Sequence, residues 1–301
     1  MPELPDVAIY VERLRGKVQG QALEQVRLAN PFLLRTVTPP LKDAFGRPLR
    51  EVRRIGKRIA LGLDGDLWLV IHLMIAGRLR WRERGSKGVG RETVALLDFP
   101  TGTLVFTEAS KKKRASLHVV AGTDALAEFD RGGLEVLDAT VEQFGAALRR
   151  ERHTLKRSLT DPELFSGIGN AYSDEILHRA RLSPVLMSTG LAPDEIARLL
   201  DACRAVLGEW TDRIRAEVGD GFPEKVTAFR EGMAVHGRYR QPCPVCGDPV
   251  QRIVHAENES NYCPTCQTGG RLLADRALSR LLKGDWPRTL EELEERRRPT
   301  G

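Results

Sequence analysis

The sequence contains no apolar run that approaches the ~20 residues of a membrane-spanning helix. Its N-terminus carries acidic residues and lacks the apolar segment of a secretory signal. An internal repeat is also absent. These absences exclude a membrane-embedded or secreted protein, and we expect an intracellular one. With 301 residues, 41% hydrophobic and 29% charged, the chain is long enough for two domains with ordinary cores.

Cysteine is scarce, and four of the five cysteines form one pattern. Cys243, Cys246, Cys263 and Cys266 have the spacing C-x2-C-x16-C-x2-C. Two close pairs of thiolates supply the four tetrahedral ligands that zinc prefers, and disulfides are the alternative in an oxidising compartment. We therefore predict one structural zinc ion. Cys203 lies on an apolar helical stripe, and we interpret it as a buried thiol.

Basic residues exceed acidic ones by 47 to 41, which gives a net charge of +6. The excess is concentrated in three runs, over residues 42–58, 111–114 and 149–157. Several separated basic runs suit a long polyanion such as a nucleic acid. Any one of these runs also fits an ordinary solvated surface.

The first residues are Met1, Pro2 and Glu3, with a second carboxylate at Asp6. If Met1 is removed, Pro2 presents a secondary α-amine. An α-amine titrates near ~7.7–8.0, so a useful fraction is neutral at pH 7, as covalent catalysis through a Schiff base requires. The alternative is a short arm ahead of a helix, where proline is common.

Residues 1–125 have the pattern of a β sandwich or barrel that is preceded by a helix. Apolar residues recur at helical spacing from Val7 to Val18. Short apolar segments bounded by turn residues then predict strands at 59–63, 67–71, 93–97, 103–106 and 117–120.

After residue 125 the pattern becomes helical, with helices predicted at 141–148, 171–180 and 196–218. Thr160 and the residues up to Glu163 resemble an N-cap followed by proline just inside a helix. The glycines of residues 166–170 would let backbone N–H groups approach a phosphate at the start of the next helix. A tight turn between helices is the alternative there.

Four motifs occur together in one order: Pro2-Glu3-Leu4-Pro5, Ile55-Gly56-Lys57-Arg58, residues 167–175 (GIGNAYSDE), and Val235-His236-Gly237-Arg238 before the four cysteines. This order resembles the formamidopyrimidine-DNA glycosylase / endonuclease VIII family of base-excision repair enzymes, over about residues 2–268.

The resemblance implies an α+β fold. It has an N-terminal two-layer β sandwich opened by a helix, a C-terminal helical domain with a helix-two-turn-helix motif, and a four-Cys zinc-finger hairpin. We assign residues 1–125 to the catalytic sandwich, 126–232 to the helical domain, 233–268 to the finger and 269–301 to a basic, helical tail.

The resemblance also implies a bifunctional glycosylase and abasic-site lyase. Pro2 would attack the sugar C1′ and Glu3 would act as acid and base, while Lys57 would hold the adjacent phosphate. The implied DNA contacts come from the turn and the basic runs: Gly169, Asn170, Lys156, Lys111, Lys112, Lys113 and Arg114. The expected partner is damaged DNA, duplex or single-stranded, bound by a monomer in the cytoplasm, or at the nucleoid in a bacterium.

The chain departs from the family pattern at the positions that fill the space left by a flipped base. Met74 and Ile75 stand where the family has one methionine, and the loop 107–114 is cationic without an aromatic wedge. The finger has Pro264 where the 8-oxoguanine enzymes have arginine, and its tip is acidic.

Two other functions are compatible with the sequence. One is a DNA-binding protein that recognises damage or unusual structure without chemistry. The other is a zinc-ribbon scaffold, which would have no use for an amine, an acid and a phosphate clamp.

Overall fold

The computed structural model describes residues 1–255, 258–273 and 286–295, and two compact units are present. The first contains Met1–Gly133 and Gly208–Ala228, and the second contains Leu134–Leu207 and Phe229–Gly301. Residues 208–228 thus cluster with the first unit although they lie within the predicted helical domain. The four-part division of the chain stays a prediction.

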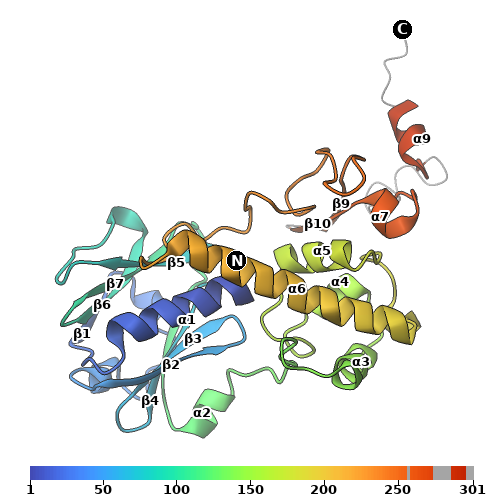
Figure 1. Cartoon of the computed structure of the whole chain (residues 1–301). Helices are drawn as coiled ribbons and strands as arrows, with labels where there is room; N and C mark the ends of the chain where they lie inside the picture. The colour runs from blue at the N-terminus through green and yellow to red at the C-terminus, as the bar shows by residue number, and fades with distance from the viewer. Residues whose placement is uncertain (256–257, 274–285, 296–301) are drawn as a thin grey trace. The chain divides into compact units, whose positions relative to one another are not determined.

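Most helices and strands of the described residues are labelled in Figure 1, and all elements follow here in chain order. They are α1 Leu4–Val18, β1 Gln25–Leu28, η1 Pro31–Leu33, η2 Leu41–Ala44, β2 Leu49–Ile55, β3 Arg58–Leu63, β4 Leu67–His72, β5 Gly77–Arg82, η3 Gly90–Glu92, β6 Thr93–Phe99, β7 Gly102–Glu108, β8 Ser116–Ala121, α2 Thr123–Ala127, α3 Val141–Arg149, α4 Leu155–Thr160, α5 Asn170–Arg179, η4 Ser188–Gly190, α6 Pro193–Val218, β9 Gln251–His255, β10 Asn258–Tyr262, α7 Pro264–Thr268 and α9 Leu290–Glu295.

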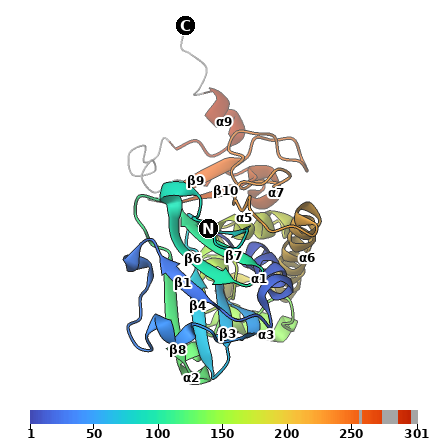
Figure 2. The same ribbon diagram turned by 90° about the vertical axis from the view of Figure 1, so that its left-hand side faces the viewer.

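The first unit is a two-layer β sandwich. One sheet has the strand order β1-β6-β7-β5 and the other β2-β3-β4-β8, with all neighbours antiparallel. Figure 2 shows β1, β6 and β7 in one layer and β3, β4 and β8 in the other. Inward side chains of both sheets, such as Leu61, Leu69, Leu97 and Phe106, belong to one buried cluster. The predicted fold class is confirmed.

Helix α1 adds its apolar face to this cluster. Its buried residues Val7, Tyr10, Val11, Leu14 and Val18 recur every three or four positions, as one helix face requires. Burying each large side chain contributes roughly 1.5–3 kcal/mol. The helix is therefore fixed on the sandwich, and its first residues have a defined position.

The second unit combines short helices with a hairpin. Phe144 of α3 packs against Phe165, with ring centroids 4.9 Å apart. Strands β9 and β10 form the antiparallel hairpin expected for the finger, in the register Asn258↔His255 to Tyr262↔Gln251. Helix α6 contributes to both units, because the division falls after Leu207.

The structure corrects the interpretation of residues 160–163 as a helix start. Thr160 is instead the last residue of α4, whose N-cap is Thr154 and whose C-cap is Asp161. The Asp161 side chain accepts a hydrogen bond from Glu163 N at 2.9 Å, which favours a turn, and Pro162 cannot continue the helix. The tail positions 274–285, within a predicted helical pattern, lie outside the described residues.

Candidate active site and metal centre

The N-terminal residues are buried in the first unit although they start the chain. Pro2 is buried, and Glu3 and Asp6 are each only 2% exposed. Glu3 is the N-cap of α1, and its backbone N donates to Asp6 Oδ2 at 3.0 Å. Asp6 thus satisfies a helix-start N–H group from the third helical position. The shorter Asp side chain at this position has a capping role.

Polar contacts also anchor α1 to both sheets. The Tyr10 hydroxyl accepts from Leu79 N at 3.3 Å and lies 3.4 Å from Leu79 O, in β5. Arg15 Nε donates to Val52 O of β2 at 2.8 Å. These contacts hold the start of the chain beside the beginning of β5.

The N-terminal amine has an environment that favours its neutral form. Burial lowers the pKa of the Met1 amine below its ordinary value of 8.0, and the cations Arg78 and Lys57 lower it further. The carboxylates of Glu3 and Asp6 act in the opposite direction. Two acids and two cations therefore surround the amine, and a neutral amine is a nucleophile.

Lys57 reaches this group from the two-residue turn between β2 and β3. Gly56 adopts φ +56° there, a conformation that hairpin turns of this length require and that glycine adopts at little cost. Arg78 is not among the site residues predicted from the sequence. It lies in a strand that alternates charged and apolar residues, directly after a turn, and this pattern is the signal that would have found it.

Glu108 holds the backbone of the basic loop between β7 and β8 through hydrogen bonds. One carboxylate oxygen of Glu108 accepts from Arg114 N at 2.8 Å and from Ala115 N at 3.2 Å. The Lys113 ammonium donates to the Glu108 carbonyl, while Lys111 and Lys112 are exposed. The loop thus presents cations on a fixed backbone.

The turn between β4 and β5 separates the two residues that the sequence could not distinguish. Met74 has φ +52° and is partly buried, whereas Ile75 is 57% exposed. Ile75 is therefore the outward side chain of this turn.

In the second unit, the glycine turn begins helix α5. Gly167 has φ +81°, and Gly169 is the N-cap, whose carbonyl accepts from Ser173 Oγ at 2.6 Å. Asn170 Nδ2 donates to Glu259 O at 3.0 Å, so the Asn170 amide links the turn to the finger hairpin.

Lys156 is engaged inside the second unit. Its ammonium lies 2.6 Å from Asn170 O and 2.5 Å from Asp174 Oδ1. The other Asp174 oxygen lies 2.8 Å from His236 Nδ1, and the exposed Phe229 ring stacks on His236. A continuous series of polar contacts thus links Lys156, Asp174 and His236 next to Asn170.

Glu175, the next residue of α5, fixes the segment that leads into the finger. Its carboxylate accepts from the backbone N atoms of Ala234, Val235 and His236 at 2.6–2.9 Å. The sequence motif therefore positions the chain for the finger as well as the turn.

The four predicted zinc ligands lie together. Their sulfur atoms are all within 4.8 Å of one another, with Cys243–Cys266 at 3.9 Å and Cys246–Cys263 at 3.4 Å. Four sulfurs bound at ~2.3 Å to one zinc ion would be about 3.8 Å apart in a tetrahedron. The arrangement fits one structural zinc ion. His178 Nε2 lies 3.3 Å from Cys243 Sγ and supports the site from α5.

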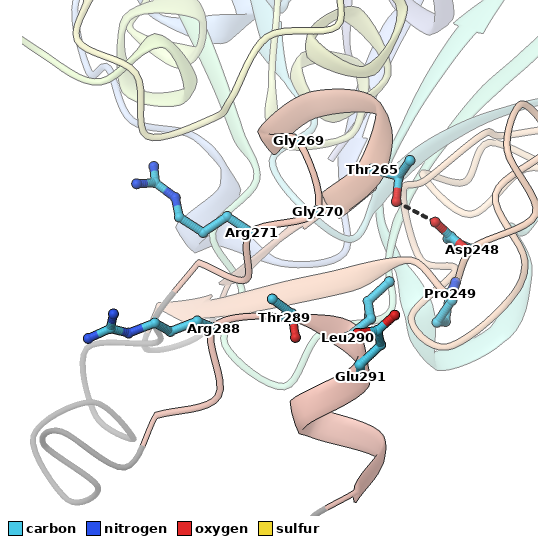
Figure 3. A pocket seen from close by; sticks show the side chains of 10 residues that line it. All are labelled: Asp248, Pro249, Thr265, Gly269, Gly270, Arg271, Arg288, Thr289, Leu290 and Glu291. Carbon is cyan, nitrogen blue, oxygen red and sulfur yellow. Dashed lines mark hydrogen bonds between the residues drawn. The ribbon is translucent and has the colours of Figure 1, made fainter.

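Two further features belong to the finger. Arg252 pairs with Glu259 at 2.9 Å, so it offsets one of the acids near the hairpin tip. A pocket of about 540 Å³ lies between α7 and the start of α9 and is lined by Asp248 and Glu291 as well as Arg271 and Arg288. Figure 3 shows these side chains. The proposed catalytic residues do not line it.

These features define a class: an α+β protein with a β-sandwich unit, a helical unit and a four-cysteine zinc finger. Models of three domains match the chain: the formamidopyrimidine-DNA glycosylase N-terminal domain at residues 1–123, the H2TH domain of that enzyme at 134–215, and the zinc finger found in FPG and IleRS at 240–269. The chain belongs to the formamidopyrimidine-DNA glycosylase family.

Individual relatives agree with this assignment. The formamidopyrimidine-DNA glycosylase of Thermus thermophilus is 36% identical over 281 residues, which cover 90% of this chain and 100% of the relative. The crystal structure of the MutM (Fpg) protein from that organism matches with a TM-score of 0.74 and 35% identity, covering 88% of this chain and 98% of that one. Lactococcus lactis Fpg in complex with abasic-site DNA shares the fold, with a TM-score of 0.77, 22% identity and coverage of 88% and 99%.

The helices of the described residues lack the length and apolar character needed to cross a membrane.

Proposed function

We propose that this protein is a bifunctional DNA glycosylase and abasic-site lyase that uses the α-amine of Pro2 after Met1 is removed. The observation that carries the proposal is the environment at the start of the chain, where Pro2 is buried and the adjacent Met1 amine has a pKa lowered by burial, among the charges of Glu3, Arg78, Asp6 and Lys57. A fixed amine with a lowered pKa, an adjacent acid and nearby cations is suited to covalent attack on a phosphate-bearing sugar.

The reaction begins when the neutral Pro2 nitrogen donates its lone pair to C1′ and the glycosidic bond breaks. The base leaves with the electron pair of the broken glycosidic bond and takes up a proton, and the Pro2 nitrogen, now bonded to C1′, releases its own N–H proton. Glu3 donates a proton to the sugar ring oxygen as the ring opens, which leaves an iminium ion between Pro2 and C1′. Loss of a C2′ proton then expels the 3′ phosphate and cuts the strand. Lys57 stabilises the negative charge of the adjacent phosphate.

DNA is the proposed partner because the cationic groups are placed to bind phosphates. The loop that contains Lys111, Lys112 and Arg114 is exposed, and the partly exposed Asn170 begins α5 directly after the glycine turn. Asn170 belongs to the same proposed clamp. Lys156 donates a hydrogen bond to the Asn170 carbonyl and so stabilises this clamp. A family member with this fold has been crystallised with abasic-site DNA.

Borohydride trapping tests the proposal, because borohydride reduces an iminium ion to a stable amine. We expect the processed protein to form a covalent complex with DNA that contains an abasic site. Pro2→Gly and a form that retains Met1 should trap at least ~100-fold more slowly, in the range that loss of a catalytic group costs. Arg84→Met, on an exposed ion pair with Glu24, is the control and should trap normally.

DNA binding without trapping on any lesion would instead establish the non-catalytic alternative. Its support is the cationic 107–114 loop, which lacks an aromatic wedge.

A further inference from the structure

One guanidinium group joins two segments of the first unit that are far apart in sequence. Arg78 Nη1 donates to Ile75 O at 3.1 Å and to Gly77 O at 2.6 Å, so it holds the β4–β5 turn. Arg78 Nε donates to Val226 O at 2.5 Å, in the segment that follows α6. The planar fork of arginine allows these contacts in different directions, which a lysine ammonium could not reproduce in the same geometry.

The segment 219–228 has further contacts with the sandwich. Val226 is buried in the main core cluster. The Phe222 ring lies 5.7 Å from the ring of Tyr10 and 6.4 Å from that of Trp81. Glu224 forms a two-pronged ion pair with Arg82, with Nη2 to Oε2 at 3.0 Å. The apolar side chains of the segment 219–228 therefore pack inward, and the sheet that contains β5 determines the position of the segment.

The charge of Arg78 also lowers the pKa of the amine of Met1, the residue before Pro2. The charged groups that face this amine are Glu3 and Asp6 from α1, Lys57 from the β2–β3 turn and Arg78 from β5. Arg78 thus interacts with three parts of the first unit: the turn that contains Ile75, the segment 219–228 and the amine.

We propose that Arg78 is a positioning residue that holds the Ile75 turn and the segment 219–228 in place beside the N-terminal amine, so that this side of the nucleotide site is formed before DNA binds. Its contact with the two segments is independent of the activity. That the Ile75 turn and the segment 219–228 form one side of a nucleotide site rests on the proposed function.

Limited proteolysis of the free protein tests the positioning role. Lys225 is an exposed trypsin site within the segment, next to the buried Val226. Cleavage after Lys225 under native conditions reports local opening, because a protease needs an extended, accessible chain. Mass spectrometry of the early peptides should show slow cleavage in the wild type and cleavage about fivefold faster or more in Arg78→Met.

Arg84→Met is the matched control, because Arg84 follows the same strand but its exposed side chain pairs with Glu24. It should be cleaved at the wild-type rate. Equal cleavage of Arg78→Met and the wild type would overturn the proposal. If Arg78→Met does not fold, as judged by circular dichroism, Glu224→Gln provides the second test. That variant weakens the ion pair with Arg82 and should also accelerate cleavage, and an unchanged rate there would overturn the fixed position of the segment.

A pH profile separates positioning from general stability. Removing the Arg78 charge should raise the pKa of the amine, so the rate of borohydride trapping in Arg78→Met should rise at higher pH than in the wild type. Arg78→Lys keeps a charge and should retain the wild-type midpoint, as should Glu224→Gln. An unshifted midpoint in Arg78→Met would refute the link to the amine. If the wild type fails to trap, the proposed function fails, while the cleavage rates still decide whether Arg78 holds the segment.

Discussion

Individual side chains near the N-terminus have roles that their residue types alone do not reveal. Asp6 and Glu3 form a capping box at the start of α1, in which each carboxylate faces the backbone N–H group of the other residue. The proposed function assigns proton transfer to Glu3, so a carboxylate with a capping position is also the proposed acid.

His72, at the end of β4, gives a prediction at this scale. Burial lowers the pKa of His72 to about 4 from its ordinary 6.5, and the charges of Arg58 and Lys57 add to the shift. The unfolded chain then binds a proton before the folded one as the pH falls. The stability that neutral His72 contributes is complete above pH 6.5 and is lost as the pH falls toward 4.

A shift of this size corresponds to about 3 kcal/mol, which we reduce to about 2 kcal/mol because the side chain is partly exposed. The free energy of unfolding in urea should decrease from pH 7 to pH 4.5 in the wild type. In His72→Gln this decrease should be smaller by about this amount. An NMR titration in which His72 changes protonation near pH 6.5 would refute the assignment.

At the scale of elements, the apolar pattern was sufficient where an element buries most of its side chains. Helix α1, strands β3, β4, β6, β7 and β8, and helix α6 agree with the predicted positions. Strands β2 and β5 were not predicted, since β5 alternates arginines with apolar residues and β2 has two pairs of charged residues between its apolar ones, and both look like a surface charge run. Strand β1 is only four residues long, which gives too little pattern.

The candidate site also contains some residues that a local pattern predicts and others that it does not. Spacing alone identified the four cysteines, because metal ligands come in local pairs. The contacts of Arg78 with Val226 and of Asn170 with Glu259 join residues 148 and 89 positions apart, and no local pattern encodes such pairs. Tertiary packing brings them together.

The finger gives the prediction at this scale. Since four thiolates surround one point, zinc binding should stabilise the β9–β10 hairpin, and a chelator should unfold it. Metal analysis should find one zinc ion per chain, and Cys263→Ser should lose it. Cys203→Ala is the control, because Cys203 is buried away from this cluster and should leave the zinc content unchanged. Equal zinc content in Cys263→Ser would contradict the site.

At the scale of the molecule, the chain separates two tasks between two units. The first unit holds the N-terminal amine, its acids and cations, and the segment fixed by Arg78. The second holds the glycine turn, the Lys156–Asp174–His236 contacts and the metal centre. The proposed chemistry depends on the first unit, and the proposed grip on DNA draws on both.

The attachment point of the trapped DNA tests the central claim most directly. The processed protein should be reduced with borohydride on abasic-site DNA, digested, and mapped by tandem mass spectrometry. We predict that the sugar remnant is attached to the peptide that begins with Pro2, at its α-nitrogen. Attachment to Lys57 or to another lysine would contradict the account.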